Sequence, residues 1–533
     1  MLSDDAFFRF LSLPRELQVS ILSSLSLRDV SRITEVCRTL HNLVRNTPAL
    51  QYPMELVACG MRDNLQSTTP LVQRLDHLRQ HDQAWRTLSW TNNVALTVPP
   101  RGRVYCRQGV LLVAKERTHP GLGVDVQQLP AMTRNVPHQV WTIEPRRNGG
   151  SDSDGRGQIY EVDASQDLVI IRQGTTPDNT FFAMYTLSEG LPHPQAVLPR
   201  FRISNSGFSD SHPSTTSGAF IRRDWVYLFD QKFEIYNWKT GDIVVQLAQS
   251  RFSMLDECAF VDDRHFSTLC VSLGSSPAAL LIYELPQSDP DVPRRYPANI
   301  PALAFLLPEI EDDQDTETHW ELVGGAAHSS TDSNVTSGGD FTTNGDDTLL
   351  MILFRLEHQW YDIVVPTQRL LDFLPDPAGV SMNANMLALR EVVWSEWGPQ
   401  NTRLRRIPAR QDGQDRGQLQ ATLFGMRRVL YHPVHTSTGE MAARVEDYHS
   451  NRVRRAEAQE SASFVVHHGD VAEGGWLGEN MLHTELPFIQ TDMIFPDKWQ
   501  GMELEDICAF VNEDGIIGAI REHGEEHNEA RTL

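Results

Sequence analysis

The spacing of apolar residues changes once along this chain, near residue 95. Before residue 95 they recur every three or four positions, which is the period of an amphipathic helix. After it they alternate in short runs bounded by glycine, proline, asparagine and aspartate, which is typical of antiparallel strands joined by turns. We therefore predict an α+β multidomain chain, with a small helical N-terminal part followed by a large all-β part.

The helical part contains two predicted helix starts. Pro14 suits the first turn of a helix, and Ser26 followed by Asp29 predicts the N-cap of a second one. Similar spacing over residues 50–58 and 71–88 predicts connector helices. The apolar face of the first helix is formed by Leu17, Ile21, Leu22 and Leu25.

The β part is long and built of hairpins. Strands are predicted over 104–114, 225–229, 233–238 and 349–356, among others, and Gly241 suits the positive φ that ends a tight turn after Asn237. About 440 residues of antiparallel meander are too many for one sandwich, and radial repetition protects the edge strands at this size. A β-propeller is the favoured architecture, with two ordinary β domains in tandem as the alternative.

Two segments of the β part have unusual composition. Residues 301–350 hold eleven acidic residues and no lysine or arginine, and 324–347 are rich in glycine, serine, threonine, asparagine and aspartate, which predicts a flexible loop over 324–347. Residues 401–455 hold eleven arginines against five acidic residues. We interpret this second segment either as a solvated face or as a patch that docks an acidic or phosphorylated target. The candidate docking residues are Arg403, Arg405, Arg406, Arg452, Arg454 and Arg455.

Composition excludes several classes of protein. The net charge of −23 argues against binding of nucleic acid or of an anionic membrane surface. The apolar run 349–354 is far too short to span a bilayer, and the acidic start of the chain is unlike a secretory signal. Six scattered cysteines without a CxxC pair indicate reduced thiols, so we expect an intracellular protein of the cytoplasm, the nucleus or both.

Catalytic motifs are missing from the sequence. There is no GxSxG nucleophile turn, no GxxxxGK phosphate loop and no HExxH zinc helix. His467 and His468 are adjacent, so on a strand they face opposite sides and are not expected to share a metal. We predict a protein that is not an enzyme, with no catalytic residues, no cofactor and no metal.

The helical part resembles a known module, the F-box motif. The resemblance covers about residues 8–50 and rests on the runs Leu13-Pro14-x-Glu16-Leu17, Ile21-Leu22-x-x-Leu25 and Val36-Cys37-Arg38-x-Leu40-x-x-Leu43. Leu40 stands where many members carry tryptophan, which reduces the aromatic contact area. The longer arrangement, with Trp85 near the end of the connector and β hairpins after it, is similar to fungal F-box proteins with propeller-like C-terminal regions.

The resemblance implies a partner and a division of the chain. An F-box binds the Skp-type adaptor of a cullin–RING ubiquitin ligase, so 1–50 is expected to be the F-box domain, 51–94 a helical connector and 95–533 a target-binding β domain. A helical unit of this size cannot bury all its apolar residues by itself, which agrees with the binding of a partner helix to those that remain. The expected adaptor-binding residues are Leu13, Pro14, Glu16, Leu17, Ile21, Leu22, Leu25, Val30, Val36, Cys37, Leu40 and Leu43.

Other interpretations of the helical part remain open at this point. It is either an adaptor-binding module or a helical cap on the β domain. A helix-turn-helix DNA reader has little support, because residues 1–90 hold ten basic and nine acidic residues and no basic stripe.

The predicted function is that of a substrate-recognition subunit of an SCF-type ligase. The alternatives are an adaptor-binding scaffold without a degradation target, and a carbohydrate-binding or hydrolytic propeller with a helical appendage. The chain has four lysines against 43 arginines, which either reflects codon bias or limits ubiquitin acceptors on the receptor itself. The second interpretation fails if added surface lysines leave self-ubiquitination unchanged.

Overall fold

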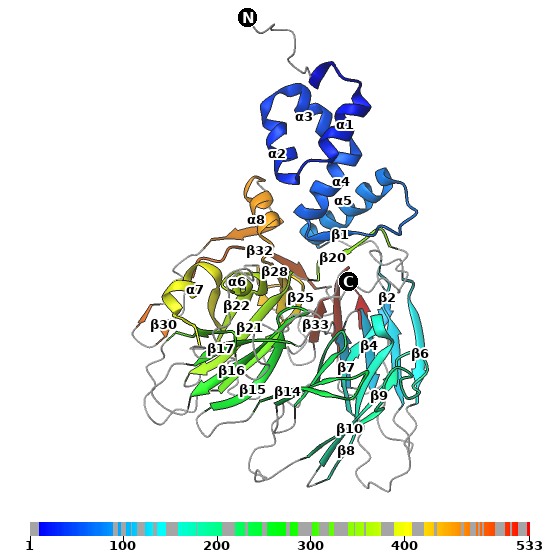
Figure 1. Ribbon diagram of the computed structural model, residues 1–533, viewed down its shortest axis with the longest axis vertical. Helices are drawn as coiled ribbons and strands as arrows, with labels where there is room; N and C mark the ends of the chain where they lie inside the picture. Colours follow the sequence, from blue (N-terminus) through cyan, green and yellow to red (C-terminus); the bar gives the residue numbers. More distant parts are fainter. Residues whose placement is uncertain are drawn as a thin grey trace, which may run out of the picture.

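An N-terminal set of helices is followed along the chain by a radial array of β-sheets (Figure 1). This computed structural model describes residues 10–88, 94–96, 103–107, 109–114, 123–131, 136–144, 158–176, 179–204, 219–229, 233–247, 253–272, 278–285, 301–308, 319–324, 339–345, 347–356, 359–374, 389–407, 421–430, 434–436, 438–459, 463–468, 476–477, 480–481, 484–495, 507–511, 514–520 and 530–532.

The N-terminal helices begin where the sequence predicts. Pro14 is the N-cap of the first α-helix, and Ser26 is the N-cap of the second, where its Oγ accepts a hydrogen bond of 3.2 Å from the Asp29 N–H. Pro48 occupies the first turn of the fourth helix, where its missing N–H leaves no hydrogen bond unmade. The elements are the 3₁₀ turn η2 (Phe10–Ser12), α1 (Arg15–Ser23), α2 (Leu27–Val36), α3 (Arg38–Arg45), α4 (Pro48–Ala58) and α5 (Leu71–Thr87).

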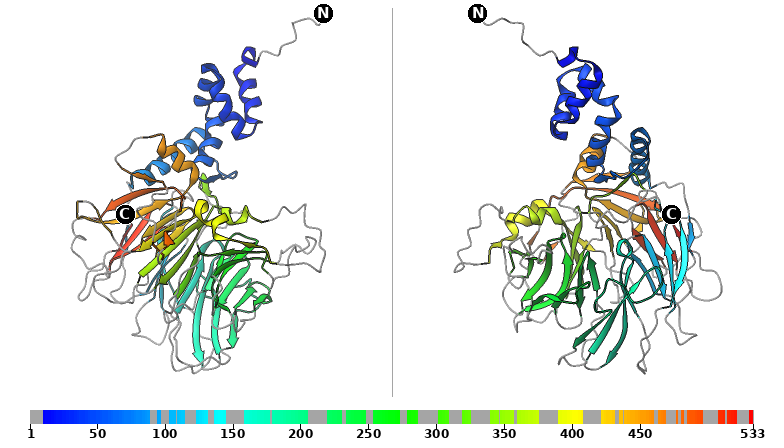
Figure 2. Two further views of the ribbon diagram at one scale, coloured as in Figure 1. Left: turned by 90° about the vertical axis from the view of Figure 1, so that its left-hand side faces the viewer. Right: turned by 45° about the vertical axis from the view of Figure 1, so that its right-hand side comes forward.

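The helices form two packed groups that share α4. Helices α1, α2 and α3 pack on one another and on α4, and they project away from the sheets (Figures 1 and 2). Helix α4 also packs on α5, which lies next to the β part. The first group has its own core of Leu22, Val30, Leu43, Val44 and Leu50. The second group buries Tyr52, Leu56, Leu75 and Leu78 together with Phe341, which comes from the β part.

The first three sheets after the helices each contain four strands that are consecutive in the chain and pair antiparallel. Period-two alternation of apolar residues produces these strands, since successive side chains point to opposite faces. They are β3 (Arg103–Arg107), β4 (Val110–Ala114), β5 (Val124–Gln128) and β6 (Gln139–Ile143); then β7 (Gln158–Asp163), β8 (Leu168–Thr176), β9 (Asn179–Thr186) and β10 (Arg200–Ser204); then β11 (Ala219–Arg222), β12 (Trp225–Phe229), β13 (Phe233–Asn237) and β14 (Ile243–Leu247).

The middle sheets carry insertions between their strands. The short strand β23 (Glu391–Val392) pairs parallel with β18, and the helices α6 (Thr367–Leu371) and α7 (Trp394–Asn401) lie between β22 and β24 in the chain. The sheets are β15 (Ser253–Phe260), β16 (His265–Ser272), β17 (Ala279–Glu284) and β18 (Leu303–Leu306) with β23; and β19 (His319–Gly324), β21 (Leu349–Leu356), β22 (Gln359–Pro366) and β24 (Arg403–Ile407).

The last sheets include the helix that touches the connector. Helix α8 (Ser450–Glu457) follows β28 and packs against α4 and β32. These sheets are β25 (Ala421–Phe424), β26 (Arg427–Leu430), β28 (Met441–Asp447), β32 (Phe488–Ile494) and β29 (Val465–His467), with β27 (Val434–His435) paired to β28; and β33 (Ile507–Val511), β34 (Ile516–Ile520), β35 (Ala530–Thr532) and β2 (Val94–Leu96). Small elements are η3 (Ala164–Gln166) and the pairs β1 (Met61–Asp63) with β20 (Phe341–Thr343) and β30 (Trp476–Leu477) with β31 (Asn480–Met481).

The sheets close into a propeller. Strand β2, which precedes the first full sheet, pairs antiparallel with β35 near the C-terminus, so the last sheet joins both ends of the β part. The first strands of neighbouring sheets also contact one another, as β7 does with β3 and β11, and β15 with β11 and β19. The predicted propeller is therefore confirmed, and the alternative of two tandem β domains is wrong.

Apolar side chains fill the spaces between neighbouring sheets. The rings of Phe233, Phe266 and Tyr283, for example, stack across two sheets, with successive ring centroids 5.6 and 4.9 Å apart. The predicted hairpin is also present, and Gly241 has a φ of 82°. The predicted run 104–114 forms two strands rather than one, because the chain turns at Gly109, whose φ is 73°.

The flexible loop predicted over 324–347 needs a correction. Residues 325–338 lie outside the described residues, but Phe341–Thr343 form β20, which pairs with β1 of the connector. Phe341 is buried among the connector helices, and the Asp340 carbonyl accepts a hydrogen bond of 3.1 Å from the Tyr52 hydroxyl. Contacts with a distant part of the chain order this polar segment, which its own composition cannot indicate.

Candidate functional site

Helix α1 exposes a line of large apolar side chains. We use the name α1 stripe for Leu17 and Ile21 of α1 and Leu25, which lies two residues after the end of α1 at Ser23. They are 52%, 38% and 39% exposed. Leu17 and Ile21 are four residues apart and therefore lie one above the other on the same helix face. Val36, at the end of α2, is 70% exposed. These exposed side chains of one small helical unit are its candidate interaction surface.

Three of the predicted adaptor-binding residues lie inside the helical unit instead. Leu22 and Val30 are 2% exposed and Leu43 is 8% exposed, and all three belong to its core. Leu22 follows Leu17 by five residues, which turns its side chain by about 140° around the helix axis. The prediction that these three contact a partner directly is wrong, and their role is to hold the helices that carry the α1 stripe.

The other predicted contact residues lie at the surface or at its margin. Pro14 and Glu16 are exposed, whereas Leu13, Cys37 and Leu40 are half-buried. Leu40 packs against the core of α1–α3, so its side chain is divided between the interior and the surface.

Polar residues that the motif does not include fix the start of α1. The buried Gln18 side chain donates hydrogen bonds of 3.3 and 2.8 Å to the carbonyls of Leu11 and Leu13. Arg15 donates to the Asn46 carbonyl at 3.1 Å and to the Thr47 hydroxyl at 3.3 Å, which ties α1 to the junction of α3 and α4. Sequence reasoning missed Arg15 because its partners, 31 and 32 residues away, become neighbours only after the helices pack. The partners of Gln18 are close in sequence, but the F-box motif gives this position no signal.

Four of the six predicted docking arginines are paired inside the protein. Arg403 is 1% exposed and lies over the Phe488 ring, and Arg405 forms ion pairs with Asp362 and Glu446. Burial raises the pKa of Asp362 to about 6, although the Arg405 guanidinium opposes that change. Arg403 and Arg405 share one face of β24, whereas Arg406 points the other way and is exposed.

The remaining predicted arginines lie on α8 at the connector. Arg452 donates to Asp447 at 2.7 Å and to the Cys59 carbonyl at 2.6 Å, and Arg455 donates to Glu55 at 2.5 Å. Arg454 is exposed. A docking patch made of all six arginines is therefore wrong, because Arg403 is buried against Phe488 and carboxylates within the protein already pair with Arg405, Arg452 and Arg455.

Helices α4, α5 and α8 meet the propeller in a junction of charged residues. The Asp82 carboxylate on α5 lies 2.8 Å from Arg86, 3.5 Å from Arg455 and 3.6 Å from Arg452. Burial alone would raise the pKa of Asp82, but the three guanidiniums together lower it below its usual value. Trp85 packs there under Arg427, whose guanidinium carbon is 3.9 Å from the indole ring centroid.

Further contacts join the connector to the β part. His77 of α5 lies 2.6 Å from the Asp340 carboxylate, and Ser67 donates to the same carboxylate at 2.7 Å. Asn451 of α8 donates to the Val57 carbonyl at 3.1 Å. The connector is thus attached to the β part through side-chain contacts with Asp340 and α8 as well as through the β1–β20 pair.

The described residues contain no group of three histidine, cysteine or acidic side chains placed to hold a metal ion. His467 stacks on Phe488 with ring centroids 4.7 Å apart, and His468 lies 3.6 Å from Glu457. Gly469 and Asp470 lie outside the described residues. Within the described part of the chain, no helix is long and apolar enough to cross a membrane.

Comparisons with known proteins identify the helical unit. Residues 10–50 match the family model described as F-box-like, so the chain has an F-box-like domain followed by a β-propeller. No curated protein matches the chain.

Similar solved structures share little sequence with this chain. The WD40 β-propeller domain of Doa1 is 9% identical, with 52% of this chain and 71% of that chain covered and a TM-score of 0.26. Raptor of Chaetomium thermophilum is 10% identical, with 97% and 38% covered and a TM-score of 0.34. Prolyl oligopeptidase B of Galerina marginata is 10% identical, with 93% and 62% covered and a TM-score of 0.31. TM-scores this low carry no functional information.

Proposed function

We propose that this protein is the substrate-recognition subunit of an SCF-type cullin–RING ubiquitin ligase. The F-box-like domain binds a Skp-type adaptor, and the propeller binds the target protein. The single observation that carries the proposal is the exposed α1 stripe on a helical unit that matches the F-box-like family model.

The position of the α1 stripe supports an external partner. Helices α1–α3 pack on one another and on α4, and Figure 2 shows them projecting away from the sheets. A helical cap would bury its apolar face against the strands, whereas Leu17 and Leu25 remain 52% and 39% exposed. An adaptor helix that covers these side chains would remove them from water, and this burial is the main favourable contribution to such docking.

The proposed division of labour follows the chain. Residues 1–50 bind the adaptor, residues 51–94 connect, and residues 95–533 present the target. The charged junction at Asp82 and the β1–β20 pair support this division, because they attach the connector to the propeller by many side-chain contacts. An attached connector sets a constant distance between the adaptor and the target.

The proposed role is non-catalytic and intracellular. The receptor contributes proximity, since it holds a target lysine near the ubiquitin-conjugating enzyme and raises the effective concentration of that lysine. The other ligase subunits supply the chemistry.

Co-purification from cells tests the proposal. Tagged full-length protein is compared with a Leu17→Asp/Ile21→Asp variant, and a Val72→Asp variant serves as control because Val72 is equally exposed on α5, away from the α1 stripe. We expect the double variant to lose the adaptor, cullin and RING subunits and to retain proteins bound by the propeller.

The same experiment separates the proposed receptor from a scaffold. A receptor is supported if proteins bound by the propeller are ubiquitinated in the presence of the wild type and accumulate when the double variant replaces it. Adaptor binding without turnover of any bound protein would instead indicate a scaffold.

A further inference from the structure

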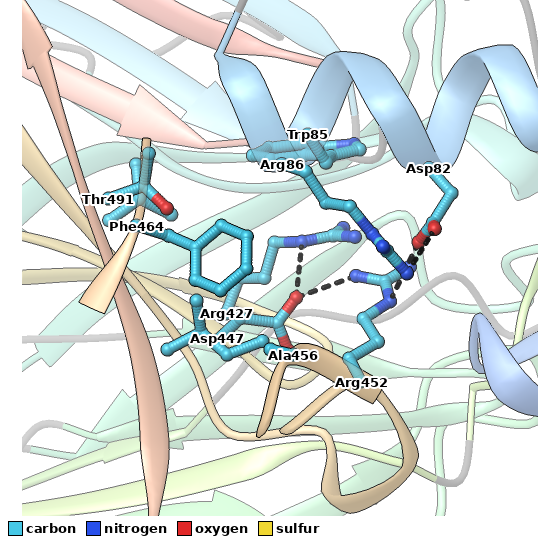
Figure 3. Close-up of a pocket in the computed structure, with 11 residues that line it drawn as sticks. Asp82, Trp85, Arg86, Arg427, Asp447, Arg452, Ala456, Phe464 and Thr491 are labelled. Carbon is cyan, nitrogen blue, oxygen red and sulfur yellow. Dashed lines mark hydrogen bonds and ion pairs between the residues drawn. The ribbon is translucent and has the colours of Figure 1, made fainter. Parts of the chain in front are cut away.

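A small cavity lies where the connector meets the propeller. Its volume is about 30 Å³, more than one water molecule needs. Figure 3 shows that its walls come from α5, from α8 and from strands of the neighbouring sheet. Apolar groups, such as those of Trp85 and Phe464, make up most of its exposed lining. Five charged side chains also line it: Asp82, Arg86, Arg427, Asp447 and Arg452.

Two buried donors of the cavity lining make no hydrogen bond within the described part of the chain, Arg427 Nη2 and Arg452 Nε. Arg452 Nε still has the Asp82 carboxylate 3.6 Å away, which leaves Arg427 Nη2 as the donor without a facing carboxylate. Arg427 is 4% exposed, its Nε donates to Asp447 at 3.2 Å, and its Nη2 makes no hydrogen bond. A buried guanidinium N–H without an acceptor is unfavourable, because the group has lost its hydrogen bonds to water and gained none in the protein. Trp85 covers the face of the Arg427 guanidinium but accepts no hydrogen bond in its plane.

The charges that line the cavity do not balance. Three guanidiniums, those of Arg86, Arg427 and Arg452, face only two carboxylates, those of Asp82 and Asp447. An excess buried cation stands out in a chain of net charge −23.

We propose that this cavity binds a small oxyanion, a phosphate or carboxylate group, through Arg427 and Arg86. Planar guanidiniums bind such groups through paired N–H···O bonds, and the oxyanion supplies both the missing acceptor and the missing charge. Arg86 belongs to α5 and Arg427 to β26, so a bound oxyanion bridges the connector and the propeller. The site strengthens the junction and is separate from the α1 stripe.

Thermal unfolding of the full chain tests the proposal. Sodium phosphate and sodium acetate are titrated separately at constant ionic strength, with sodium chloride as the balancing salt. We expect a saturable rise of the wild-type midpoint with at least one of the two oxyanions. The half-saturating concentration should increase at least about tenfold in Arg427→Gln, which removes the guanidinium that donates to the anion.

Two further variants keep the test decisive. Ala456→Met extends a side chain that lines the cavity and retains every charge, so it should abolish the saturable response even if Arg427→Gln folds poorly. Arg406→Gln removes an exposed arginine elsewhere and should respond as the wild type does. No saturable response in the wild type, or the same half-saturating concentration in Ala456→Met as in Arg406→Gln, would overturn the proposal.

Discussion

The guanidinium of Arg455 in α8 donates a hydrogen bond of 2.5 Å to the carboxylate of Glu55 in α4, 400 residues earlier in the chain. This ion pair joins α8, which lies between β28 and β29 in the chain, to the helix on which α1, α2 and α3 pack. The long separation in sequence shows that a late insertion of the β part, α8, anchors the N-terminal helices. The orientation of the F-box-like domain therefore depends on the correct folding of the propeller.

The junction should be sensitive to the loss of Arg452. Arg452→Gln leaves Asp447 and Asp82 buried with one cation fewer, and removing one partner of a buried ion pair lowers the free energy of unfolding by about 3–5 kcal/mol. Arg454→Gln, two residues away on the exposed face of α8, should change it by less than about 0.5 kcal/mol. Urea unfolding measures the free energy of unfolding of both variants. Equal losses in the two variants would show that the ion pairs of Arg452 do not stabilise the fold.

The junction should also weaken in acid because of Asp82. Its pKa is lowered in the folded protein, so its charged form adds stability above the unfolded-state pKa of about 4. This stability is lost as the pH falls through the lower, folded-state pKa. We expect Asp82→Asn to be less stable than the wild type at pH 7 and the difference to narrow below about pH 4. A difference that stays constant from pH 7 to pH 3 in urea unfolding would contradict this assignment.

Two neighbouring leucine positions on α1 should behave in opposite ways. Leu22→Ala opens a cavity in the core of α1–α3 and should destabilise that unit by about 2–5 kcal/mol. Leu17 is half exposed, so Leu17→Ala should keep the stability of the unit within about 0.5 kcal/mol of the wild type. Hydrogen exchange of the amides in α1–α3 measures the difference. Equal loss of protection in the two variants would place Leu17 in the core.

Gly241 and Gly439 provide a matched test of the propeller turns. Their φ angles are 82° and 83°, but a Cβ at Gly241 would lie 2.7 Å from Leu198 Cδ1, whereas at Gly439 nothing lies within 4 Å. Both alanine variants carry the strain of the left-handed conformation, about 1–2 kcal/mol. Gly241→Ala also carries the clash and should be less stable than Gly439→Ala by about 1 kcal/mol in urea unfolding. Equal stability would mean that Leu198 moves aside freely.

The sequence predicted the features that depend on neighbours along the chain. The Pro14 and Ser26 helix starts, the turn at Gly241 and the spacing of the F-box motif all involve residues close in sequence, so their physics is visible in a short window. The propeller followed from the length and the repeated hairpins.

Features that depend on distant partners could not be predicted in the same way. Nothing near Leu22 distinguishes it from Leu17, because only the packing of α1 on its neighbours decides which side is inside. Arg403 and Arg452 looked available because their buried partners, Phe488 and Asp82, are 85 and 370 residues away. The strand β20 lies in a polar stretch and exists because β1 pairs with it.

The affinity of the full chain for a Skp-type adaptor tests the central claim most directly. We expect the wild type and Val72→Asp to bind with the same dissociation constant within about twofold. Leu17→Asp/Ile21→Asp should bind at least about 100-fold more weakly, because it places two charges in an apolar interface, while its thermal unfolding stays unchanged. A folded wild type that does not bind the adaptor, or a double variant that binds as tightly as the wild type, would contradict the account.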